Sequence, residues 1–196
     1  MNLTLAQKEI VTRLIESGVN RSTELLGRMS HTKWGIVTSS INEIPVVRLL
    51  SWYQRENAPH VGARFKSRAD VPLEILILFP AKSSNSVTTA VTKPYGERMG
   101  KLPDLVKLTI GEVSNVLAQG VIGAVADEYD LTIILSVPEV LQGSKAEILS
   151  TVLGDYDGRE DILMMSHIDM YAENLSADCS MIIIVNAESL RRILTH

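Results

Sequence analysis

The stretch "LILFPAKS" (residues 76–83) returns 106 residues later as "IIIVNAES" (residues 182–189). Closer to the N-terminus the chain matches itself without gaps at an offset of 96 residues, where Glu16 falls on Glu112 and Gly27 on Gly123. The matches keep the same order in both halves, which is typical of an internal repeat. We therefore predict one domain, residues 1–196, built of two repeats at about residues 1–96 and 97–196.

Each repeat is expected to run helix, strand pair, strand, short helix. The first long helix is predicted over residues 5–29. The second begins near Pro103, whose missing N–H suits a first turn, with Asp104 at the positive end of the helix dipole. Short β-branched runs predict strands at residues 35–41, 74–79, 131–137, 162–168 and 181–185, and residues 187–196 predict a closing helix.

Two details of this layout follow from charge and apolar patterning. Continuous apolar runs such as residues 75–79 imply strands that are covered on both faces. The basic residues Arg64, Lys66 and Arg68 are interpreted as a solvated loop. The offset grows from 96 to 106, so the second repeat has gained ten residues, which we place in the polar stretch 141–161.

Composition excludes several classes of function. Of 196 residues, 45% are hydrophobic and 21% charged, which predicts a globular chain. The formal charge of −4 argues against nucleic-acid binding. No apolar run reaches the roughly 20 residues of a membrane span, and the N-terminus lacks the basic start and apolar block of a signal peptide. Cys179 is the single cysteine, so we expect a buried, inert thiol in a cytoplasmic protein.

The second long helix carries the residues of a candidate site. At 100° per residue, four of them fall within about 60° of arc: Leu108, Glu112, Asn115 and Gln119. An apolar stripe is predicted on the opposite side, at Val106, Ile110, Val113, Leu117, Val121 and Ala124. The stripe would anchor the helix and hold the polar residues outward on a rigid element, as a site that reaches into another molecule requires. A plain solvated face is the alternative.

A Glu and an Asn three residues apart are common by chance, but Pro138 follows Asn115 by 23 residues. This spacing resembles the mark of the CheC/CheX/FliY family of chemotaxis phosphatases: Asp or Ser, three residues, Glu, two residues, Asn, 22 residues, Pro. Leu108 stands where that family has Asp or Ser, and Ser114 where it has Gly. The resemblance covers nearly the whole chain. It implies an α/β (α+β) fold with an internal pseudo-two-fold, paired long helices and a largely antiparallel six-stranded sheet.

In the first repeat the matching site is altered. Glu16 is retained, but Val19 holds the position of the Asn and Asn42 the position of the Pro. Asn20 is one residue off, which rotates it by about 100° around the helix. We therefore predict a degenerate first site and one intact Glu-x-x-Asn site, which is the CheX-like arrangement.

The resemblance also implies a substrate, a phosphorylated response regulator of the CheY type that carries an aspartyl phosphate and its own Mg²⁺. Asn115 would orient the attacking water, because a carboxamide can donate to and accept from one water without adding charge. Glu112 would pair with the regulator's active-site Lys, and Pro138 and Gln119 would support the pair. No cofactor on the protein itself is expected, and the four His residues show no metal-ligand spacing.

Two other functions stay open. An adaptor of the same fold would bind chemotaxis or signalling proteins without catalysis, which Leu108 and the degenerate first site favour. A small-molecule sensor domain would require a well-formed apolar pocket. A CheD-like protein is a further candidate partner, and the sequence leaves open whether the chain is a monomer or a homodimer.

Overall fold

The computed structural model describes residues 4–44, 46–53, 56–69, 71–96, 99, 102–154, 161–172, 175–186 and 189–190. The first half contains α1 (Leu5–Ser30), β1 (Gly35–Ile44), α2 (Val46–Tyr53), β2 (Pro59–Ala69), β3 (Leu73–Pro80), α3 (Ala81–Thr92) and the 3₁₀ turn η1 (Lys93–Tyr95). The second contains α4 (Leu105–Tyr129), β4 (Ile133–Leu135), β5 (Glu139–Ser144), α5 (Lys145–Leu153), β6 (Asp161–Ala172) and β7 (Leu175–Asn186). The order of elements therefore repeats.

The described strands form one antiparallel sheet in the order β1-β6-β7-β3-β2-β4. β5 pairs with β2 through residues 59–64, and β4 pairs with β2 through residues 67–69. The two short strands thus form one edge strand with a break at residues 136–138, where Pro138 has no N–H for the ladder. Each repeat's first strand pairs with the hairpin of the other repeat. This arrangement confirms the predicted fold class.

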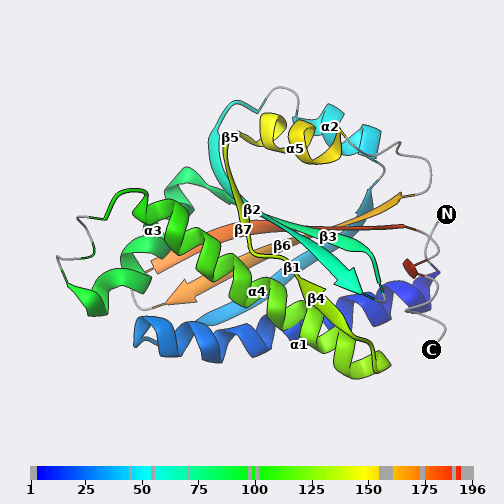
Figure 1. Cartoon of the computed structure of the whole chain (residues 1–196), viewed down its shortest axis with the longest axis horizontal. Helices are drawn as coiled ribbons and strands as arrows, with labels where there is room; N and C mark the ends of the chain where they lie inside the picture. Colours follow the sequence, from blue (N-terminus) through cyan, green and yellow to red (C-terminus); the bar gives the residue numbers. More distant parts are fainter. Residues whose placement is uncertain are drawn as a thin grey trace.

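Helices cover both faces of the sheet (Figure 1). α1, α3 and α4 lie on one face, and α2 and α5 on the other, at the top of Figure 1. Successive residues of a strand point to opposite faces, so Ile75 and Ile77 enter the core under the long helices, whereas Leu76 and Leu78 enter the core under α2 and α5. The prediction that apolar runs are covered on both faces is confirmed.

The long helices α1 and α4 lie side by side and antiparallel. Arg13 of α1 pairs with Glu128 near the end of α4 at 2.8 Å, and the Ser22 hydroxyl donates to the carbonyl of Val116 at 3.1 Å. A Cβ on Gly18 would overlap the backbone of α4 at Val121. Because glycine has no side chain, the two helices approach closely and their register is fixed.

The prediction for the first long helix is confirmed, since α1 spans Leu5–Ser30. The prediction that Pro103 occupies the first turn of the second helix is wrong by two residues. Asp104 adopts a left-handed φ of 58°, which is incompatible with helix geometry, so α4 begins at Leu105. α4 has, by length and composition only, the character of a membrane span, but more than half of its most apolar stretch is buried inside the fold.

Several elements differ from the expectations. Arg64, Lys66 and Arg68 lie on β2 rather than in a solvated loop, and Arg64 is buried. The helix α5 occupies part of the polar stretch at residues 141–161, and it begins with a capping box of Ser144 and Glu147. Of the closing helix predicted at 187–196, the structure describes only residues 189–190, which are helical.

Candidate functional site

The predicted pair lies on the solvent-facing side of α4. Glu112 and Gln119 are exposed, and Asn115 is half-buried. Within the described part of the chain, neither the Glu112 carboxylate nor the Asn115 carboxamide forms a hydrogen bond or an ion pair. Both polar groups are therefore available to another molecule.

The opposite side of α4 fixes the rotation of the helix. The side chains of Ile110, Val113 and Leu117 are fully buried, and Val121 and Ala124 are nearly so. This is the apolar stripe expected from the helical period, packed between the sheet and α1. Because these side chains cannot leave the core without exposing apolar surface, the polar face is held outward.

Pro138 reaches the same helix from the broken edge strand. A Cβ built on Gly111 would lie 3.8 Å from the Pro138 Cγ and 3.3 Å from the Val140 Cγ2. Gly111 and Asn115 are four residues apart, which makes them neighbours on one side of a helix. The structure therefore brings Pro138 to the flank of the turn that carries Glu112 and Asn115. The sequence analysis gave Gly111 no role, although its lack of a side chain lets Pro138 approach.

The edge strand is held on both sides of its break. The Ser136 N–H donates to the Lys66 carbonyl at 2.8 Å, and the Lys66 N–H donates to the Ser136 hydroxyl at 3.1 Å. Beyond the break, the Glu139 carboxylate lies 3.8 Å from Arg64, whose Nε donates to Glu74 at 2.7 Å. The sequence analysis missed this network, because its members come from three strands.

Leu108 shares the polar face of α4 and is 56% exposed. It lies one turn before Glu112, at the position where the family mark has Asp or Ser. Val137, next to Pro138, is 85% exposed. The site is therefore a carboxylate and a carboxamide with an exposed aliphatic side chain at one end, rather than an all-polar surface.

The first repeat presents a different arrangement. Glu16 and Asn20 are exposed on α1, whereas Val19 is only 1% exposed. Asn42 lies on β1 opposite Met165. A side chain buried as deeply as Val19 cannot reach a bound partner, and valine has no group that could orient a water.

The remaining candidates for chemistry lie away from α4. His167 and Asp169 on β6 are 3.4 Å apart, on the opposite face of the sheet from the buried Ile168 and Met170. No group of three or more metal-ligating side chains gathers among the described residues. Burial raises the pKa of the Cys179 thiol, and the carboxylates of Asp178 and Asp169 raise it further. The thiol is thus kept protonated and unreactive.

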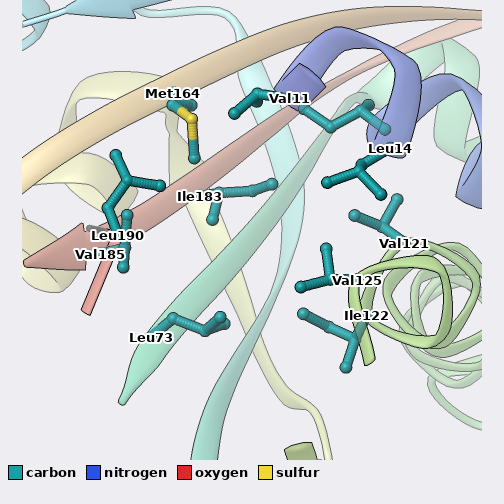
Figure 2. A pocket seen from close by; sticks show the side chains of 11 residues that line it. Val11, Leu14, Leu73, Val121, Ile122, Val125, Met164, Ile183, Val185 and Leu190 are labelled. Carbon is teal, nitrogen blue, oxygen red and sulfur yellow. The ribbon is translucent and has the colours of Figure 1, made fainter. Parts of the chain in front are cut away.

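An apolar cavity lies between α1, α4 and the sheet, and Leu190 also lines it (Figure 2). Its volume is about 40 Å³. Pockets for small organic ligands measure about 300–1,000 Å³, so this cavity does not support the sensor alternative.

The chain is similar in sequence or in fold to several known proteins. No family model matches the chain. The CheC1 protein of Halobacterium salinarum, named as a candidate CheY-P phosphatase, is 22% identical over 182 residues, which cover 90% of this chain and 88% of that protein. Thermotoga maritima FliY is 13% identical with a TM-score of 0.79, covering 100% of this chain and 97% of that one.

Two further solved structures share the fold. FliM in the FliG–FliM complex of H. pylori is 10% identical with a TM-score of 0.70, covering 99% of this chain and 100% of that one. CheX from Desulfovibrio desulfuricans is 13% identical with a TM-score of 0.56, covering 89% of this chain and 99% of that one. These proteins include one that is named as a candidate phosphatase and one that was solved in a complex with FliG.

Proposed function

The chain belongs to the CheC/CheX/FliY family, and from this premise we propose that it dephosphorylates a response regulator of the CheY type. The observation that carries the proposal is the position of Glu112 and Asn115 on the outward face of α4. Neither polar group has a partner among the described residues, and the other face of the helix is buried in the core. A rigid helix of this kind can insert its side chains into the active site of a partner.

The proposed reaction is hydrolysis of an aspartyl phosphate. The Asn115 carboxamide accepts a hydrogen bond from one water and donates another to it, and so holds the water in line with the phosphorus atom. Attack forms a bond from the water oxygen to phosphorus as the bond to the aspartyl oxygen breaks. The products are inorganic phosphate and the free Asp carboxylate. A hundredfold acceleration requires about 2.7 kcal/mol, which positioning alone can supply.

The other residues would align the partner. Glu112 pairs with the regulator's Lys, a charge-assisted contact that does not place negative charge on the phosphoryl group. Gln119, exposed one turn beyond Asn115, extends the contact along the helix. Pro138 limits how the turn around Asn115 can move, because it packs against Gly111.

We also propose where the reaction takes place and which metal ion and partners it involves. The Mg²⁺ belongs to the phosphorylated regulator, and the phosphatase contributes no cofactor of its own. We place the protein in the cytoplasm, where such regulators act. A CheD-like protein and a second copy of the chain are further proposed partners.

A second candidate function is that of an adaptor that binds signalling proteins without hydrolysis. The structural likeness to FliM of a FliG–FliM complex favours it. The exposed Leu108 favours it too, because an aliphatic side chain at the edge of the site gives binding area but no polar group for catalysis.

Turnover separates the two functions. A CheY-type receiver is phosphorylated with a small phosphodonor, and the donor is then removed. The decay of the phosphorylated receiver is followed in the presence of this chain, at about one-twentieth of the concentration of the receiver. A phosphatase accelerates the decay of the whole pool, since each molecule acts many times. An adaptor binds the receiver in a pull-down but leaves the decay unchanged, and that result would replace the proposal.

A further inference from the structure

The edge strand that carries Pro138 contains one residue more than the strand it pairs with. Leu135 lies opposite Ser67 and Glu139 lies opposite Arg64, so four steps along the edge strand face three steps along β2. An extra residue of this kind is a β-bulge, which bends a strand and re-aims its side chains, and bulges are over-represented next to active sites. The bulge at residues 136–138 therefore lies where the strand meets α4.

The bulge decides which side chain of the edge strand meets α4. Leu135 and Val140 both pack against the core under the long helices, although residues five apart on a regular strand face opposite ways. Regular alternation from Leu135 would point Val137 at the core and Pro138 at solvent. Instead, Val137 is exposed and Pro138 approaches Gly111. The extra residue is what turns Pro138 toward the helix.

Ser136 holds the bulge with its side chain. Its N–H donates to the Lys66 carbonyl at 2.8 Å, and its hydroxyl accepts from the Lys66 N–H at 3.1 Å and donates to the Val137 carbonyl at 2.9 Å. In a regular antiparallel pair, two such residues would exchange both bonds between their backbones. Here the Ser136 hydroxyl takes the place of the Ser136 carbonyl as the acceptor, which ties the irregular segment to β2.

The edge strand of the first repeat has a bulge as well. On β1, Thr38 lies opposite Ile168 and Ser40 lies opposite His167, so two steps face one step of β6. β1 forms the other edge of the sheet, and the ungapped register of the two repeats places Ser40 on Ser136. Because the bulge recurs beside both long helices, we treat it as part of the architecture of the repeat rather than as an irregularity of one loop.

We propose that Ser136 is a positioning residue of the site on α4. Its hydroxyl holds the bulge in the register that turns Pro138 toward Gly111, and Pro138 limits the movement of the turn that carries Glu112 and Asn115. The inference rests on the proposed function, since it gives Ser136 a role in presenting the carboxamide that orients the water. Ser136 itself touches neither the water nor the phosphate.

The test compares two substitutions at this position. Ser136→Ala removes the hydroxyl, whereas Ser136→Thr keeps it on a β-branched side chain that suits a strand. Ser176→Ala, at an exposed serine of β7, is the matched control. Three quantities are measured: the backbone amide NMR signals, the single-turnover decay of a phosphorylated CheY-type receiver at saturating protein, and the affinity for that receiver held in its active form by Mg²⁺ and beryllofluoride.

Ser136→Ala should shift the amide signals of Gly111 and Asn115, which lie on another element, as well as the signal of Lys66. The single-turnover rate should fall at least about tenfold, because misplacing a catalytic group by about 1 Å can cost about 10² in rate. The affinity for the receiver should stay as in wild type, since every side chain of the site is still present. Ser136→Thr and Ser176→Ala should both match wild type in all three measurements.

The outcomes separate this inference from the proposed function. If Ser136→Ala shifts only the signals of Lys66 and of residues 135–138 and leaves the rate unchanged, the inference is overturned and the phosphatase proposal stands. An equal loss of rate with Ser136→Thr would also overturn it, because the hydroxyl would then not be the group that matters. If wild type does not accelerate the decay, the phosphatase proposal fails, whereas shifted signals of Gly111 and Asn115 in Ser136→Ala would still support the role of Ser136 in positioning that turn.

Discussion

Replacing Asn115 with alanine should separate the proposed catalysis from folding. The side chain is half-buried and makes no hydrogen bond with the described residues, so its removal breaks no hydrogen bond with them. Alanine is favoured over asparagine in a helix by about 0.5 kcal/mol. At about 2–4 °C per kcal/mol for a chain of this size, the melting temperature should move by about 2 °C or less.

The effect on catalysis should be far larger. If Asn115 positions the attacking water, its loss removes the entire stimulated rate. Deleting one preorganised hydrogen-bonding group from an active site costs about 10²–10³ in rate, or roughly 2.7–4 kcal/mol. We therefore expect decay of phosphoprotein to fall at least a hundredfold, toward the regulator's own rate. Binding of the regulator should persist, because the carboxamide acts on the water.

The assay is single-turnover decay of a phosphorylated CheY-type receiver at saturating protein, where differences in affinity no longer affect the rate. Asn85→Ala is the matched control, since Asn85 is an exposed residue on a different helix, α3. With the control variant, the phosphorylated receiver should decay at the same rate as with wild type. If the phosphorylated receiver decays as fast with Asn115→Ala as with wild type, Asn115 is not catalytic, and the adaptor function explains the chain better than the phosphatase function. A fall in melting temperature of more than about 5 °C would show that Asn115 supports the fold.

Two further predictions concern packing. In denaturant titration, Gly18→Ala should lower the free energy of unfolding by about 1–3 kcal/mol, because its Cβ would overlap the backbone of α4. The control Gly123→Ala should leave the free energy of unfolding unchanged or raise it, because its Cβ would meet only the tip of Arg21 at 3.9 Å. Equal effects of the two substitutions would contradict the close crossing of α1 and α4. Cys179 should not react with a disulfide reagent at pH 8 while the protein is folded, since burial raises the pKa of its thiol. It should react once denaturant is added, and rapid labelling of the native protein would show that the thiol is accessible.

Local rules predicted the parts of the fold that depend on local sequence. α1 and the rotation of α4 follow from helical periodicity, and the β-branched apolar runs at residues 75–79 and 181–185 predicted covered strands. β2 was missed because Arg64, Lys66 and Arg68 suggest a solvated segment. Arg64 is buried because carboxylates from β3 and β5 meet it there. Glu74 is ten residues away and Glu139 is 75 residues away, so no window of sequence around β2 contains both partners.

In the candidate site, too, only the features that depend on local sequence could be predicted. Helix geometry alone predicted that Glu112 and Asn115 would face outward together. The approach of Pro138 could not be worked out in that way, because it depends on the break between β4 and β5 and on the missing side chain of Gly111.

The crossing of α1 and α4 holds the outward face of α4 in place. Gly18 and Gly120 bring the backbones into contact, and Ser22 bonds across to the Val116 carbonyl. Sliding one helix along the other would drive side chains of neighbouring turns into that contact, because packed interiors resist displacement. Glu112 and Asn115 are therefore presented on a helix that α1 holds in one register.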